Sequence, residues 1–131
     1  MSPIDLWPDV EVELVALLGA ALTGTRLCTE LPADLLDVLP VLQVQRVPGG
    51  GDDGFRLDRA LVDADAYAAT RAGASQLART ARAVLLGLPG TTTTAAVFGR
   101  VRTVAAPAWR PYENPGLRRM GTTYELLFHP A

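Results

Sequence analysis

The chain has 131 residues, of which 49% are apolar and 20% are charged, and its formal net charge is −2 at pH 7. This composition excludes a disordered chain and a general nucleic-acid binder, because apolar residues are abundant and no basic block is present. All 12 basic residues are arginines. The length fits one domain, residues 1–131, with a single hydrophobic core.

Cys28 is the only cysteine, so the chain can form neither an internal disulfide nor a zinc site built from several thiolates. The apolar run 14–22 is too short to span a bilayer. Acidic Glu11 and Glu13 precede it, where a signal peptide has basic residues. These features predict a soluble protein of a reducing cytosol with no membrane association.

The first third of the chain predicts a helix and two strands. The helix covers 9–23, with Asp9 as its N-cap and Gly24 as its stop. Alternating apolar and polar residues indicate strands at 25–31 and 41–47, and the proline-bracketed segment 32–40 between them has room for a short turn of helix. The expected apolar face of the long helix comprises Val10, Leu14, Leu17, Leu18 and Ala21.

The sequence GGGDDG at 49–54 joins the second strand to a long extended run at 55–69. A phosphate-binding loop would need a lysine and a helix directly after the glycines, and the pattern offers neither. A calcium loop would need further oxygen ligands at alternate positions. The stretch therefore predicts the tip of a β-hairpin.

A second helix is predicted at 71–88, with Thr70 as its N-cap and Pro89-Gly90 as its stop. A polar turn, a strand at 96–106, a loop at 107–121 and a last strand at 122–128 follow. This order predicts an α+β fold in which an antiparallel or mixed β-sheet packs against two main helices. The expected buried stripe of the second helix comprises Leu77, Ala81, Val84, Leu85 and Leu88, and its solvent face Ser75, Arg79 and Arg82.

Asp63 and Asp65 lie one residue apart after an apolar run, and they have two interpretations. The pattern superficially resembles the nucleophile motif of haloacid-dehalogenase-type phosphatases, in which one aspartate attacks phosphorus and magnesium neutralises the phosphoryl oxygens. That chemistry usually includes a lysine, and the chain has none. The simpler interpretation is a polar strand face shared with Leu61 and Tyr67, while the small residues between them form the opposite face under a helix.

The other reactive and aromatic residues do not add up to an active site. His129 is the only histidine and lies two residues from the C-terminus, so a catalytic triad would depend on it alone. Cys28 lies in the apolar phase of its strand and is expected in the core. Trp7, Trp109 and Tyr112 are typical of core or interface anchors. We therefore expect no catalytic residue, no bound metal and no cofactor.

Segment 56–90, a long strand ending in DADAY and then a helix rich in Ala, Arg and Leu, is the most informative part of the chain. A strand, a tryptophan-proline loop and a closing strand follow in VRTVAAPAWRPYENPGLRRMGTTYELLFHP. With the N-terminal helix and the strand around TRLCTEL, this order resembles the tail terminator (tail completion) proteins of long-tailed bacteriophages. It especially resembles those from phages of GC-rich actinobacteria.

The resemblance implies a structural virion protein of the tail or neck that is not an enzyme. In this family six copies form a ring on the head-proximal end of the tail tube, where the ring stops tube polymerisation and offers a surface to the head-tail connector. The implied partners are further copies of the chain, the major tail tube protein and the connector protein. Assembly would take place in the host cytoplasm, and DNA would pass through the lumen without specific binding.

Two groups of residues are candidates for contacts in such a ring. The loop 107–121 is long for a hairpin and carries residue types favoured at interfaces: Trp109, Arg110, Tyr112, Arg118 and Arg119. A lumen that passes DNA is better lined by acidic or neutral groups than by arginines. The candidates for that lining are Asp52, Asp53, Asp63 and Asp65, for which solvation outside the ring is the equally open alternative.

Three other functions stay open on the sequence. One is another neck component, such as a head-tail joining protein. The second belongs to a different class, a small metal-dependent phosphatase or nuclease that uses Asp63 and Asp65. The third is a stand-alone ligand-binding domain in which Trp109 and Tyr112 stack on a ligand.

Overall fold

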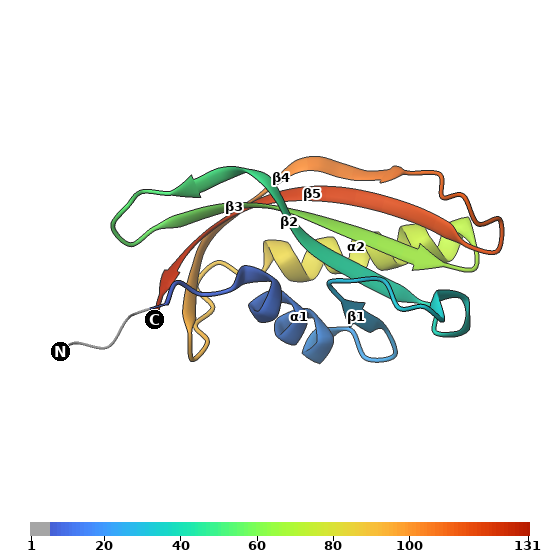
Figure 1. Cartoon of the computed structure of the whole chain (residues 1–131), viewed down its shortest axis with the longest axis horizontal. Helices are drawn as coiled ribbons and strands as arrows, with labels where there is room; N and C mark the ends of the chain where they lie inside the picture. The colour runs from blue at the N-terminus through green and yellow to red at the C-terminus, as the bar shows by residue number, and fades with distance from the viewer. Residues whose placement is uncertain (1–5) are drawn as a thin grey trace.

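A five-stranded mixed sheet with both long helices on one side forms the fold (Figure 1). The computed structural model describes residues 6–131. The predicted α+β class is confirmed. In chain order the elements are α1 (Val10–Ala21), β1 (Arg26–Cys28), the 3-10 turn η1 (Leu35–Asp37), β2 (Val41–Asp52), β3 (Asp58–Ala68), α2 (Arg71–Leu86), β4 (Ala96–Trp109) and β5 (Arg118–Pro130).

β3 is the central strand of the sheet, whose strand order is β1-β2-β3-β5-β4. β1 runs parallel to β2, and the other three pairs of neighbours are antiparallel. β3 pairs with β5 without a break, from Asp58↔Phe128 to Ala68↔Arg118. The side chains of β3 therefore lie in the middle of each sheet face, and they decide what packs there.

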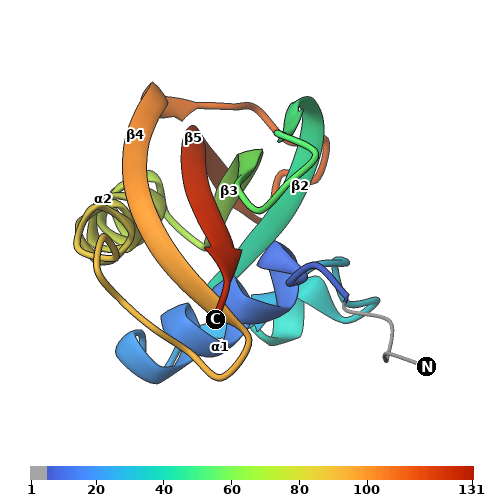
Figure 2. The ribbon, with the colours of Figure 1, turned by 90° about the vertical axis from the view of Figure 1, so that its left-hand side faces the viewer.

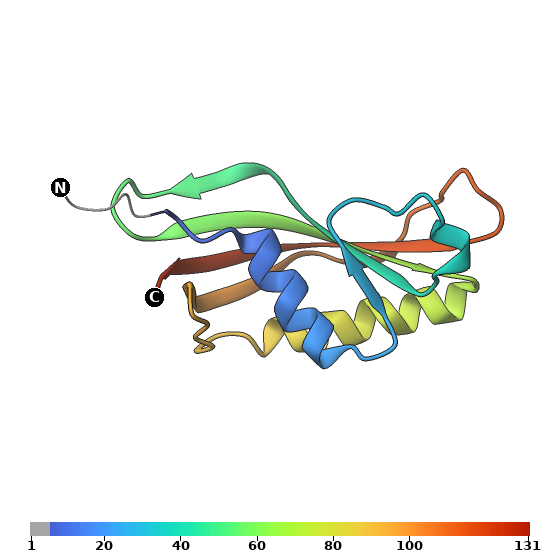
Figure 3. The same cartoon turned by 60° about the horizontal axis from the view of Figure 1, so that its bottom comes forward.

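Both helices cover the same face of the sheet (Figure 3). On that face β3 presents a valine and four alanines, all buried: Ala60, Val62, Ala64, Ala66 and Ala68. α2 meets this surface with its own alanines, Ala74, Ala78 and Ala81. Because methyl groups need little space, the helix can lie close to the strand. The prediction that the small-residue face of this strand lies under a helix is confirmed.

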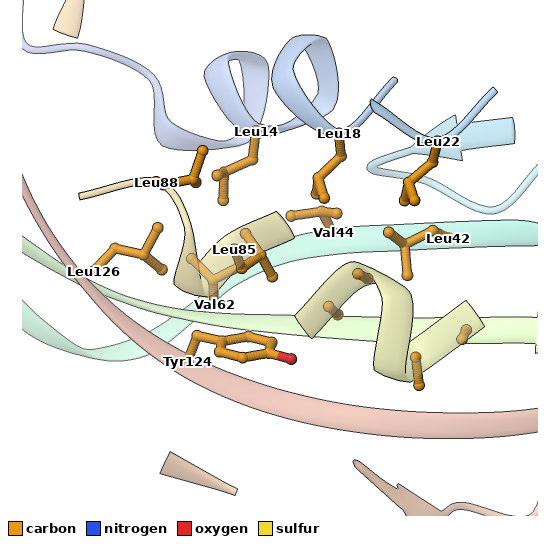
Figure 4. Packing of buried hydrophobic residues seen from close by; sticks show 14 of the residues in the cluster. Leu14, Leu18, Leu22, Leu42, Val44, Val62, Leu85, Leu88, Tyr124 and Leu126 are labelled. Atoms are coloured by element: carbon orange, nitrogen blue, oxygen red, sulfur yellow. The ribbon is translucent and has the colours of Figure 1, made fainter. Parts of the chain in front are cut away.

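The larger apolar side chains fill the space between α1 and the sheet. Leu14 and Leu18 of α1 and Leu22 just after it lie over Leu42 and Val44 of β2 (Figure 4). Seen from the hairpin end, the sheet is strongly twisted, with α2 beside β4 and α1 beneath the strands (Figure 2). Burial of this apolar surface supplies most of the stability of such a domain, at roughly 25 cal/mol per Å².

The predicted N-caps of both long helices are confirmed. Asp9 Oδ1 accepts hydrogen bonds from the backbone N–H groups of Glu11 and Val12, at 3.0 and 3.4 Å. Thr70 Oγ1 accepts one from the N–H of Gly73 at 3.0 Å. Each cap satisfies amide groups that the first turn of a helix leaves unpaired.

The buried faces of the helices differ in detail from the prediction. Ala21 is exposed, because α1 ends there and the chain turns so that Leu22 enters the core instead. Leu17 and Val84 are only half-buried. On α2, Arg79 is exposed as predicted, whereas the predicted solvent-facing Ser75 and Arg82 are half-buried beside the sheet.

Two predicted segments had wrong bounds. The strand expected at 25–31 has only three residues, because the chain leaves the sheet after Cys28 and folds over the face opposite the helices. The loop expected at 107–121 is shorter, since β4 continues to Trp109 and β5 begins at Arg118. Pro107 does not end β4, because the register shifts between Ala105 and Ala108 and a bulge in an edge strand tolerates proline.

The predicted β-hairpin is confirmed, but its tip lies later than expected. Residues 49–52 still belong to β2, and Gly50 pairs with Ala60 after a register shift that follows Val47. Gly50 has a φ of +72°, and a Cβ there would collide with the carbonyl oxygen of Arg59. A glycine is therefore required for the bulge, and the bulge sets the direction of the hairpin arm.

We predict that Gly50→Ala destabilises the protein by on the order of 2 kcal/mol, because the new methyl group meets backbone and the φ angle is unfavourable. Gly19→Ala is the matched control, since Gly19 is exposed within α1 and nothing surrounds its Cβ position. It should stabilise by about 0.5–1 kcal/mol. Urea denaturation measures both changes, and equal effects of the two substitutions would contradict this account.

Candidate functional site

The sheet face opposite the helices carries most of the ionisable strand residues. Within residues 6–131 no helix packs on it. At one end, the segments 29–40 and 110–117 cover it through a small cluster made of Leu35, Val41, Tyr67 and Leu117. The rest of this surface, called the open face below, is built by alternate residues of β2, β3, β5 and β4.

Asp63 and Asp65 lie on the open face, as the strand alternation predicts, and Arg110 holds them together. Arg110 Nη1 lies 3.2 Å from Asp65 Oδ1 and 3.6 Å from Asp63 Oδ2. The hydroxyl of Thr123 donates a further hydrogen bond to Asp63 Oδ1 at 2.6 Å. A guanidinium therefore lies between the two carboxylates, and the three side chains form an ion-pair cluster.

Gly121 makes this cluster possible. It pairs with Asp65 on one side and with Ala108 on the other. A Cβ atom on Gly121 would collide with Cδ, Nε and Cζ of Arg110. The missing side chain leaves a channel across β5, and the arginine crosses the strand through it to reach the carboxylates on β3.

Asp65 is the more buried of the two aspartates, with 8% of its surface exposed. Desolvation raises the pKa of Asp65 above its usual range, while the positive charges of Arg110 and Arg119 lower that pKa and the charge of Asp63 raises it. Its cross-strand neighbour Gln43 accepts a hydrogen bond from the Tyr67 hydroxyl instead of donating to the carboxylate. Arg110 is thus the main group that stabilises the ionised form.

The five candidate interface residues all make contacts within the chain. Trp109 packs against the main core, and the guanidinium of Arg71 lies 4.9 Å from its ring centroid. Tyr112 meets Tyr67 edge to face, with ring centroids 5.6 Å apart.

The arginines among them fasten the connection between β4 and β5. Arg119 donates to the carbonyl oxygens of Arg110 and Pro111, at 3.3 and 3.0 Å, and its guanidinium lies over the ring of Tyr112. Arg118 donates to the carbonyl oxygens of Pro115 and Leu117, at 2.9 and 3.1 Å. Contacts within the chain therefore hold the aromatic and arginine side chains of this connection in place.

Asp52 and Asp53 lie far from this cluster, at the tip of the β2–β3 hairpin. Asp53 Oδ1 accepts hydrogen bonds from the N–H groups of Phe55, Arg56 and Leu57, at 2.9, 2.8 and 3.0 Å. These bonds lower the pKa of Asp53 below its usual range. The structure thus separates the four candidate acids into an ion-paired couple on the open face and a turn-forming couple at the tip.

Sequence reasoning missed the ion pairs between strands. Arg46 and Asp58 form a two-point contact at 2.9 and 2.8 Å, with Asp58 buried. Both occupy core-facing positions of their strands, and a charge of each sign in that phase on two neighbouring strands is the signal that would have found them. On the open face Glu125 lies 3.4 Å from Arg102 and 4.0 Å from Arg59.

The residues needed for a catalytic or metal centre are dispersed. In the described part of the chain, no group of three or more His, Cys, Asp and Glu side chains is placed to hold a metal ion. His129 is far from the aspartate cluster. It lies eight residues along β5 from Gly121, the partner of Asp65, which is about 26 Å at roughly 3.3 Å per residue. Cys28 is half-buried against the small cluster, and desolvation raises the pKa of its thiol. A thiol with a raised pKa is a poor nucleophile.

Comparison with known proteins identifies the family of the chain. Residues 7–107 match the model of a family described as phage tail termination protein. The chain belongs to this family. Tail terminators are structural virion proteins, so the chain is a component of the phage tail that contacts other tail or head components. A search of curated proteins found no match to it.

The family match includes the hairpin tip and both aspartates of the open face, and it ends at Pro107. The candidate interface residues of the β4–β5 connection lie beyond it. Among residues 6–131, none of the helices has the length and apolar character needed to cross a membrane.

We predict that Arg110→Gln destabilises this terminator near pH 7 by about 1–2 kcal/mol, because it leaves Asp65 without its main positive partner. The pKa of Asp65 should rise further. A carboxyl with a raised folded pKa loses stability as pH rises from its unfolded pKa through its folded pKa, so the deficit should shrink toward about pH 4.

Urea denaturation at several pH values measures this difference. Arg110→Gln combined with Asp65→Asn is the control, since it removes the unpaired charge and should remove most of the pH dependence. A deficit of the same size at both ends of the pH range would contradict the assignment.

Proposed function

We propose that six copies of the chain form a ring that caps the head-proximal end of the phage tail tube. The ring ends polymerisation of the major tail tube protein and presents its other surface to the head-tail connector protein. The match of residues 7–107 to the tail termination family carries this proposal. Assembly takes place in the host cytoplasm before the tail joins the head.

The shape of the subunit supports a ring. A closed ring needs two different complementary patches on each copy, one at each side of the subunit. The hairpin tip projects at one end of the strands, and the β4–β5 connection lies at the other (Figure 1). In the ring, the preorganised connection with Tyr112, Arg118 and Arg119 meets the tube or the connector, where aromatic and arginine side chains contribute most to binding.

We infer that the open face lines the lumen. DNA must slide past this surface, and free cationic groups would hold its phosphates. Three arginines of this face have acidic partners within the same chain: Arg110 with Asp63 and Asp65, and Arg59 and Arg102 with Glu125. Arg119 is held by the carbonyl oxygens of Arg110 and Pro111. The acids therefore act by neutralising arginines, and Asp63 contributes to the wall more directly than the buried Asp65.

Termination is tested with purified tube protein. Adding the chain should stop tube growth, so that electron microscopy shows short tubes with a ring at one end, whereas tubes without it grow to variable length. Native mass spectrometry should show a species of six times the 13.9 kDa chain mass, alone or on the tube. Unchanged tube growth at saturating concentration would refute the proposed function.

The lumen assignment makes a separate prediction for Asp63→Asn with Glu125→Gln. The double variant leaves Arg59 and Arg102 without their partner and Arg110 with Asp65 alone, so it should bind double-stranded DNA at low salt at least tenfold more tightly than wild type. Fluorescence anisotropy with a labelled duplex measures this, and added salt should weaken the binding. Glu30→Gln with Asp34→Asn, which removes two exposed carboxylates that form no ion pair in the described chain, is the control variant and should leave DNA affinity near that of wild type.

A further inference from the structure

Phe55 is a large apolar side chain held out in water. It lies at the tip of the β2–β3 hairpin with 87% of its surface exposed. The turn that presents it is firmly built, since Asp53 accepts three backbone hydrogen bonds and its own N–H donates to the carbonyl oxygen of Leu57 at 2.9 Å. Arg56 ties the tip to the end of β5, where it donates to the carbonyl oxygen of Pro130 at 3.0 Å.

This construction favours a contact with another molecule. A turn whose backbone is already held by hydrogen bonds loses little backbone entropy when a partner binds it, and an exposed phenyl ring gains from leaving water. The tip carries a net negative charge as well, because the exposed carboxylates of Asp52 and Asp53 outnumber the one exposed guanidinium of the turn, that of Arg56.

An apolar groove of about 550 Å³ lies at the opposite end of the same strands. It is formed where α1 ends, β2 begins, β3 ends and α2 begins. In the described chain none of its lining residues is charged. They include Leu22, Pro40, Ala68, Thr70, Gly73 and Leu77.

The groove has the charge that suits the tip. The N-terminus of α2, at Thr70, opens onto it, and the first turn of α2 has no acidic residue to offset the positive end of the helix dipole. Arg79 is exposed one turn from the lining residue Gln76. The acidic tip with its exposed phenyl ring, called the knob below, thus complements an apolar groove with a positive border.

A tip cannot enter the groove of its own chain. β3 has 11 residues, so tip and groove lie about 35 Å apart along the strand at roughly 3.3 Å per residue (Figure 1). We propose that Phe55 of each copy inserts into this groove of the next copy, an inference that rests on the proposed ring. Because the two patches differ, the contact is heterologous, and its repetition gives a ring when the rotation between neighbours closes.

Two variants test this contact. Phe55→Ser removes the knob, and Ala69→Glu with Thr80→Glu places like charge at two exposed positions of the groove. Each variant alone should be monomeric by native mass spectrometry at concentrations where wild type is hexameric. An equal mixture should give a heterodimer and nothing larger, because one copy still has a knob, the other still has a groove, and only one junction can form.

Leu86→Ser, which replaces an exposed leucine at the other end of α2, is the control and should remain hexameric. Circular dichroism and thermal unfolding establish that all variants are folded. A hexamer of Phe55→Ser, or a mixture without the heterodimer, would overturn the inference while leaving the ring intact. A wild-type chain that never self-associates would also overturn it, whereas the tube-growth experiment decides termination separately.

Discussion

The close contact of α2 with β3 through alanine methyl groups determines the rest of the architecture. From Ala60 to Ala68 the helix-facing side of β3 has only alanines and one valine, so α2 can lie directly on the middle of the sheet, and its own alanines keep the contact close. The larger leucines of α1 then fill the remaining space over β2. With both helices on one side, the opposite face is left to polar and charged side chains, which is where the alternation of β3 places Asp63 and Asp65.

In the ion pairs of the open face the positive charge always comes from an arginine. Arginine keeps its charge at any physiological pH and offers several donors, so one guanidinium can serve two carboxylates, as Arg110 does. Desolvation of Asp65 opposes its ionisation, so the cluster costs stability that a pair of apolar residues would not. The proposed place of this face in the lumen would give a reason to retain the cluster, because arginines that are occupied by carboxylates do not hold phosphates.

Local features of the sequence were sufficient to predict the caps at Asp9 and Thr70, the phase of β3 and the β2–β3 hairpin, because each depends on residues close in the chain. The position of Arg110 could not be predicted. It depends on the pairing of β4 with β5, on the register shifts that absorb Pro107, and on a glycine at 121 that opens the way across the strand. None of these has a local pattern, which is why 107–121 read as a loop and its arginines as free interface groups.

Both edges of the sheet are protected against pairing with another copy. β4 has three register shifts and contains Pro107, which cannot donate to a neighbouring strand. On the other edge, beyond the short β1, the carboxylate of Glu11 accepts the hydrogen bond of the Arg46 N–H at 2.8 Å, so a backbone donor of β2 is already used. Extension of the sheet from copy to copy would produce open fibres as readily as rings. In the proposed ring, contacts between side chains at the ends of the subunit would instead fix the angle between neighbours, and a fixed angle that closes is what gives a ring with a set number of copies.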